Sequence, residues 1–189
     1  MDIDLAGLAR DPIVNVVYTG IKHPIRLLMD SECFPAAVTL IYSGMDAMAF
    51  LNMPPKQTDV TGDDFIKWAE RYIRFPCQEQ LSGLDLYGAR CSVLHAHGIK
   101  SKLSRQGRCR MIGYSDHMVP EVSYRPNVSR ELVMVSIRAL ADAFFSGVDR
   151  FLVDLFSDVA NATLPEERLK WMHHTLPYQA GTPKNPQSV

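Results

Sequence analysis

An arginine, a cysteine and two histidines stand close together in the stretch LDLYGARCSVLHAHG, residues 84–98. Arg90 carries a permanent positive charge and can bind a phosphate group through two N–H donors at once. His95 and His97 titrate near neutral pH and can accept or donate a proton. A cation and a proton-transfer group are what the cleavage of a phosphodiester bond requires. The stretch therefore indicates phosphoryl chemistry, and these residues are candidates for a catalytic site.

The spacing of apolar residues predicts that this stretch forms a helix over about residues 79–97. The apolar positions are Leu84, Tyr87, Cys91 and Leu94. On such a helix His95, five residues after Arg90, diverges from it around the axis but stays within a turn and a half. His97, seven residues after Arg90, nearly stacks over it two turns on. Both histidines are therefore possible partners of the arginine.

The other elements that would position this helix are also predicted to be helical. Apolar residues at three- and four-residue spacing predict helices within residues 23–53, 63–73 and 127–158. Thr61 is expected to cap the second of these helices, since it precedes two aspartates and an apolar face. Gly98 is expected to end the helix that carries the histidines.

The overall prediction is an all-α protein, a bundle of four or five helices. Residues 99–127 are polar and interrupted by Gly and Pro, so we expect a small irregular or β-hairpin insertion there. Asn127 or Ser129 would cap the long helix that follows. One helical domain would occupy residues 1–176, and residues 177–189 would be a disordered C-terminal tail.

The composition fits one soluble globular domain. The chain has 189 residues, of which 47% are hydrophobic, and 20 Lys and Arg balance 21 Asp and Glu to a net charge of −1. A surface that attracts nucleic acid would therefore have to be local. Four cysteines without a C-x-x-C pair indicate reduced thiols. No secretory signal pattern or membrane-length apolar run is found, so we expect a cytoplasmic protein without membrane contact.

The segment YGARCSVLHAHG resembles the R-x4–6-H motif of HEPN domains, a widespread class of helical bundles. Arg90 and His95 match the shorter spacing of that motif, and Arg90 and His97 match a longer one. The upstream segment AAVTLIYSGMDAMAFL is similar to the early HEPN helix, with Asp46 at its acidic position. Cys91 directly follows the arginine, where many members carry a polar residue.

The resemblance covers about residues 25–160 and implies a metal-independent endoribonuclease that needs no cofactor and acts as a homodimer. It implies that His95 transfers the proton of a ribose 2′-hydroxyl and that Arg90 holds the scissile phosphate. The products would carry a 2′,3′-cyclic phosphate and a 5′-hydroxyl. HEPN toxins commonly pair with a nucleotidyltransferase-like neighbour, so a toxin or stress and defence role with an antitoxin or such a partner is also implied. The possible accessory residues are Cys91, His97 and Asp46.

A basic segment follows the predicted catalytic helix. Five of eleven consecutive residues are basic and none is acidic: Lys100, Lys102, Arg105, Arg108 and Arg110. Such charges beside a cleft would attract a polyanion, and the attraction would weaken with added salt. We predict that this basic segment binds RNA, although most charge runs are simply solvated loops. Sequence-specific reading is not indicated, because the nearest aromatic residues for stacking are Tyr114 and Tyr124.

Two interpretations without catalysis stay open. The chain could be a helical module that binds a nucleotide or a partner protein, in which case Cys91 marks the loss of activity. Alternatively, His95 could be a hydrogen-bonded histidine at a helix end, with Arg90 in a structural ion pair with Asp46 or Asp85.

A zinc site is a further alternative, because the sequence holds four possible ligands: Cys91, His95, His97 and Cys109. Structural zinc sites use paired units such as C-x2–4-C or H-x3–5-H. The spacing of Cys91 and His95 supplies one such half-unit, but no second ligand stands near Cys109. We therefore expect no metal.

Overall fold

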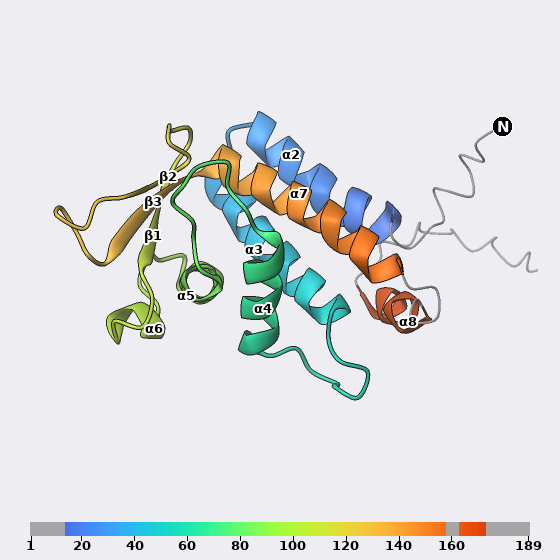
Figure 1. Ribbon diagram of the computed structural model, residues 1–189. Coiled ribbons are helices and arrows are strands. Elements are labelled where there is room, and N and C mark those ends of the chain that lie inside the picture. Colours follow the sequence, from blue (N-terminus) through green and yellow to red (C-terminus); the bar gives the residue numbers. More distant parts are fainter. Residues whose placement is uncertain (1–13, 158–162, 173–189) are drawn as a thin grey trace, which may run out of the picture.

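The computed structural model describes residues 14–157 and 163–172, so the tail predicted for 177–189 lies outside the described residues. The elements in chain order are the π-helix η1 (Val14–Lys22), α2 (His23–Asp30), α3 (Phe34–Leu51), α4 (Gly62–Tyr72), α5 (Gly83–Ala96), α6 (Lys102–Arg105), β1 (Met111–Ser115), β2 (Val122–Tyr124), β3 (Leu132–Ser136), α7 (Ile137–Phe156) and α8 (Thr163–Trp171). Figure 1 shows the strands together at one end, with α2, α3 and α7 running away from them toward α8.

Helix α3 is the centre of the fold. It packs against η1, α2, α4, α5, α7 and α8. By length and composition alone it is the one helix of the described residues that could cross a membrane. Half of it is buried inside the protein, however, including Ile41, Tyr42 and Met45, which are fully covered. We therefore interpret α3 as a core helix of the fold, and its packing against six other elements holds its side chains in place.

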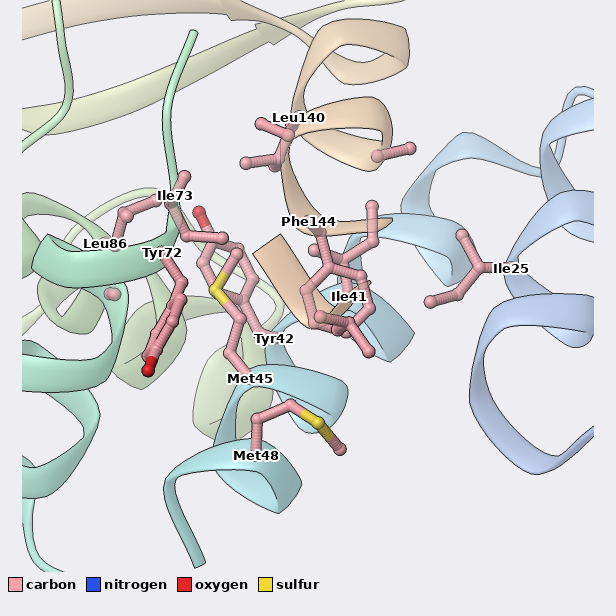
Figure 2. Packing of buried hydrophobic residues seen from close by; sticks show 14 of the residues in the cluster. Ile25, Ile41, Tyr42, Met45, Met48, Tyr72, Ile73, Leu86, Leu140 and Phe144 are labelled. Atoms are coloured by element: carbon pink, nitrogen blue, oxygen red, sulfur yellow. The ribbon is translucent and has the colours of Figure 1, made fainter. Parts of the chain in front are cut away.

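Aromatic residues of α4 and α7 fill the core beside α3. Trp68 lies edge-on to Phe144 and Phe151, with ring centroids 6.3 and 5.9 Å apart. Figure 2 shows Phe144 of α7 against Ile41 of α3. Gly44 makes this approach possible, because a Cβ atom there would lie 2.6 Å from Cζ of Phe144. The close contact between Gly44 and Phe144 therefore fixes how α3 and α7 pack against each other.

The prediction of an all-α fold is wrong, because β1, β2 and β3 form a mixed sheet in the order β1–β3–β2. Strand β3 pairs in parallel with β1 and antiparallel with β2. It lies inside residues 127–158, which were predicted as one helical run. Val133 and Val135 are buried at alternate positions, and β-branched residues with this two-residue period favour a strand.

The predicted insertion at residues 99–127 also differs from the structure. It contains β1 and β2, but these two strands do not pair with each other, so there is no β-hairpin between them. Helix α7 is capped neither by Asn127 nor by Ser129. Its cap is Ser136, the last residue of β3, whose hydroxyl accepts a hydrogen bond from the backbone N–H of Ala139. The strand therefore passes directly into the helix.

Capping boxes fix the starts of α4 and α5. The predicted cap Thr61 is confirmed: its hydroxyl accepts from the backbone N–H of Asp64, and the Asp64 carboxylate accepts from the backbone N–H of Thr61. Ser82 and Asp85 form the same reciprocal pair at the start of α5. Each pair satisfies two backbone donors that a helix leaves without partners. Helix α5 therefore begins at Gly83, four residues later than predicted.

Candidate functional site

Arg90, His95 and Asp46 lie together where α5 packs against α3. The Nε and Nη2 atoms of Arg90 lie 2.8 and 2.7 Å from Oδ2 of Asp46. The Nη1 atom of Arg90 lies 3.3 Å from Nε2 of His95. The Arg90 and Asp46 side chains are 23% and 24% exposed, and His95 is more exposed still. These three residues, which we call the Arg90 cluster, are therefore open to solvent on one side.

Two helices supply the members of the Arg90 cluster. Side chains of a helix lean toward its N-terminus, which carries His95 back toward the long side chain of Arg90. Asp46 comes from α3, where core packing on the neighbouring faces holds it in place. His97 does not join them: it ends α5 in the left-handed conformation, with φ 45° and ψ 35°. The expected cap Gly98 is therefore wrong by one residue.

The electrostatics of the cluster follow from partial burial. Burial raises the pKa of Asp46 above its usual range, although the hydrogen bond and charge of Arg90 oppose this. Burial alone would lower the pKa of Arg90, but the hydrogen bond and charge of Asp46 outweigh it and raise that pKa. The pair is therefore an ion pair at the edge of the core, with charges that largely compensate each other.

The hydrogen-bond pattern leaves the cluster able to bind an anion. The contacts with Asp46 and His95 use three of the five N–H groups of Arg90, and the Cys91 thiol also interacts with this guanidinium. At least one donor thus remains for a phosphate oxygen. A guanidinium only donates, so Nε2 of His95 would be the acceptor in a hydrogen bond between them. An imidazole is a group that can transfer a proton.

The two cysteines named as zinc ligands lie in different surroundings. Cys91 contacts Tyr87; burial raises the pKa of that phenol, and the charge and hydrogen bond of Cys91 raise it further. Cys109 lies against Gly88 of α5 and interacts with Ser101. Among residues 14–157 and 163–172, no three His, Cys, Asp or Glu side chains are grouped as metal ligands would be. The described residues therefore do not assemble the zinc site considered from the sequence.

The basic segment divides into two parts in the structure. Four of its members are exposed on or beside α6: Lys100, Lys102, Arg105 and Arg108. Arg110 is different, because its guanidinium contacts Glu79 and Asp85 at 2.7 Å each and the carbonyl oxygen of Gln80 at 2.9 Å. It also lies over the ring of Tyr124. We therefore conclude that Arg110 stabilises the fold. Only the other four basic residues remain candidates for contact with RNA.

A pocket that the sequence did not predict lies at the end of α5, against the start of α3 and against β1. Its volume is about 340 Å³. Residues that line it, such as Phe34 and Val38, belong to the apolar pattern that predicts a helix within residues 23–53. Apolar residues have the same helical spacing whether they face a pocket or a filled core, so no sequence signal separates the two. His97 was named for its spacing from Arg90, but in the structure it lines this pocket.

Comparison of the chain with protein-family models, with curated proteins and with solved structures finds no match. The resemblance to HEPN domains, which depends on one short motif and one helix, therefore stays a prediction. Because a fold does not determine an activity, the function has to be inferred from the Arg90 cluster and its surroundings.

Proposed function

We propose that this chain is a metal-independent endoribonuclease that cleaves RNA by attack of a ribose 2′-hydroxyl on the adjacent phosphate. The observation that supports it is the contact of a fixed guanidinium with an imidazole at the protein surface: Arg90, held by Asp46, lies 3.3 Å from His95. The exposed basic residues beside α6 add a positive surface that favours a polyanion.

Each member of the cluster has a defined task in this reaction. His95 accepts the proton of the 2′-hydroxyl, whose oxygen then forms a bond to phosphorus. The bond from phosphorus to the 5′-oxygen breaks, and the leaving oxygen takes a proton from the imidazolium. Arg90 stabilises the negative charge that develops on the phosphate oxygens. Asp46 acts as a positioning residue, because its contact is with Arg90.

The proposal also covers location and partners. The described cysteines form no disulfide, and the one apolar helix of membrane length is half buried in the fold. Both features are typical of cytoplasmic proteins, so we propose the cytoplasm as the location. From the resemblance to HEPN domains we propose a homodimer with two clusters facing a shared cleft. The same resemblance is the basis for proposing a toxin or defence role and an antitoxin or nucleotidyltransferase-like partner.

The proposed reaction is tested by incubating the purified protein with structured and unstructured RNA in EDTA. We expect cleavage that survives chelation, with products that end in a 2′,3′-cyclic phosphate and a 5′-hydroxyl. A substrate with a single 2′-deoxyribose at the cleaved position is expected to resist cutting there. Cleavage of that substrate, or cleavage that requires a divalent cation, would contradict the proposal.

Asp46→Asn is expected to lower kcat for RNA cleavage about tenfold to a hundredfold, with a smaller change in KM. The amide no longer attracts the guanidinium, so Arg90 loses its fixed orientation while its charge remains. Asp46→Glu restores the carboxylate and should recover part of the loss. Steady-state kinetics of the wild type and the two variants measure kcat and KM separately. A rise in KM with unchanged kcat would show that Asp46 contributes to RNA binding and not to the orientation of Arg90 during the reaction.

Removing two exposed charges by Lys102→Gln and Arg105→Gln is expected to weaken RNA binding to a similar extent for all sequences. Each lost phosphate contact also reduces the salt dependence, so the slope of log K against log salt should fall by about one to two. Fluorescence anisotropy at several salt concentrations measures both. Lys56→Gln with Lys67→Gln removes two exposed charges elsewhere and is the control. Equal losses in the two double variants would exclude a specific role for the basic segment.

A second candidate function is a non-catalytic module that binds a nucleotide or a partner protein. The observation that favours it is the ion pair itself, because Asp46 already compensates the charge of Arg90. This candidate predicts binding of nucleotides without cleavage of any RNA in the EDTA assay.

A further inference from the structure

The pocket at the end of α5 has an apolar interior lined with rings. Val38 and Thr39 of α3 and Val93 of α5 form its walls. Three flat groups from different elements complete it: Phe34 of α3, Tyr114 of β1 and His97 after α5. A volume of about 340 Å³ with this lining suits one flat aromatic group better than an extended chain.

The pocket and the Arg90 cluster lie along the same seam between α3 and α5. On α5, Arg90 and Val93 are three residues apart and therefore share one face, and His97 directly follows the last residue of the helix. A rise of 1.5 Å per residue places Val93 about 5 Å and His97 about 10 Å beyond Arg90 along the helix axis. On α3, Asp46 and Thr39 are two turns apart on a common face. A nucleotide whose phosphate contacts Arg90 could therefore reach the pocket with its base.

Two basic residues, Arg138 and Lys100, lie next to residues that line the pocket. None of the described residues that line it is acidic. The guanidinium of Arg138 lies over the ring of Phe34, 5.7 Å from its centroid. Lys100, which is exposed, directly follows Ile99 on the rim. Flat rings inside and cations at the edge are the combination with which proteins bind single-stranded nucleic acids.

The polar groups of the lining are already engaged, with one exception. The hydroxyl of Tyr114 lies 2.8 Å from that of Tyr42, and Thr39 donates to the carbonyl oxygen of Pro35. For the imidazole of His97 the described residues supply no hydrogen-bond partner. His97 also holds a left-handed backbone conformation, which residues other than glycine adopt only at an energetic cost. The lining thus offers rings for stacking and one free polar edge.

We propose that this pocket is a base-binding subsite: it holds the nucleobase next to the phosphate bound at Arg90, by stacking and with little preference among the four bases. The inference rests on the proposed ribonuclease function for the position of the phosphate. The affinity of the pocket for a base does not itself require cleavage, so the two proposals can fail separately.

The direct test compares two probes that differ in the base. Isothermal titration calorimetry of the wild type is carried out with adenosine 5′-monophosphate and with ribose 5-phosphate, which lacks the base. We expect the nucleotide to bind at least about tenfold more tightly, as stacking of one base provides. Uridine 5′-monophosphate should bind within a few-fold of the adenosine compound. Equal affinity for the nucleotides and ribose 5-phosphate would overturn the subsite.

Two variants locate the binding. Thr39→Trp fills the pocket, so the nucleotide is expected to bind this variant no more tightly than ribose 5-phosphate does. His97→Gly removes the ring while glycine keeps the left-handed backbone, so the fold is retained and nucleotide affinity should fall several-fold. His117→Gly, the same substitution at an exposed position outside the pocket lining, is the control and should bind as the wild type does. If Thr39→Trp fails to fold, His97→Gly decides.

Cleavage assays on the same proteins separate this inference from the proposed function. Two results together support the subsite. Thr39→Trp or His97→Gly should remove the part of the affinity that depends on the base, and Arg90→Ala should weaken binding of the nucleotide and of ribose 5-phosphate equally. If RNA is cleaved but these pocket variants bind the nucleotides as the wild type does, the subsite is wrong and the ribonuclease proposal stands. If nucleotides bind in the pocket but no RNA is cleaved, the ribonuclease proposal is wrong and the pocket is a nucleotide site.

Discussion

His95→Ala is expected to lower kcat for RNA cleavage by a hundredfold to ten-thousandfold, because it removes the group that accepts the 2′-hydroxyl proton. Binding of RNA should change less than the rate, since Arg90 remains to bind the phosphate and the role proposed for His95 is proton transfer. Arg90→Ala is expected to lower kcat by a hundredfold to a thousandfold through loss of charge stabilisation in the transition state. It should also weaken binding, because a phosphate loses its cation.

Single-turnover cleavage of a fluorescent RNA measures these rates apart from binding. His117→Ala is the control for His95, since it removes an exposed imidazole outside the cluster. The double variant of Arg90 and His95 should lose little more than the worse single variant, because residues that act as a unit are not additive. Unchanged cleavage in His95→Ala would assign the proton transfer to another group and end the proposed mechanism.

The second large effect concerns stability: Arg110→Ala is expected to lower the free energy of unfolding by about 3–5 kcal/mol. Asp85, whose side chain is 3% exposed, accepts hydrogen bonds from the backbone N–H and the guanidinium of Arg110. Without the guanidinium this carboxylate is buried with no opposite charge. The same carboxylate caps α5, so the start of the helix that carries Arg90 should loosen as well.

Urea unfolding followed by far-UV circular dichroism measures the loss. Arg108→Ala is the matched control, because it removes an exposed arginine two residues away and should change stability by less than about 0.5 kcal/mol. Similar stabilities of the two variants would show that the Arg110 network contributes little. A loss of RNA binding by folded Arg110→Ala, with its stability intact, would restore the original prediction of an RNA contact.

The pH dependence of this network has a defined sign. Burial would raise the pKa of Asp85, but hydrogen bonds from Arg110 and Ser82 outweigh it and lower that pKa below the ordinary value of 3.8. A carboxyl group whose pKa is lower in the folded state stabilises the fold above its unfolded pKa and stops doing so as pH falls through the folded one. The stability difference between wild type and Arg110→Ala should therefore shrink below about pH 4.

Local signals in the sequence were sufficient for the start of α4 and for the helix that carries the motif. Thr61 caps α4 as its side chain predicts, and the helix with Arg90 and His95 exists. The contact of Arg90 with Asp46 depends on the packing of α3 against α5. Spacing within one helix could not choose between Asp46 and Asp85 as the partner of Arg90, because that choice is made by tertiary structure.

Local signals could not predict the sheet or the role of Arg110 either, because both depend on tertiary structure. Strand β3 is five residues long and runs into α7 without a turn, so its period of two is hidden beside a long helical pattern. Its parallel partner β1 lies some twenty residues earlier. Arg110 stands in a basic segment, and the acids that bind it, Glu79 and Asp85, lie 31 and 25 residues away. No periodicity connects such residues.

Asp46 belongs to α3, the helix that the rest of the protein surrounds. A carboxylate attached to so confined a segment cannot follow a substrate that arrives at an unsuitable angle, and the guanidinium it holds is equally fixed. An RNA substrate of the proposed reaction would itself have to adapt by unstacking and turning its backbone toward the protein. That distortion costs least in loops, bulges and unpaired ends. The rigid helix α3 would thus favour flexible segments of RNA as substrates.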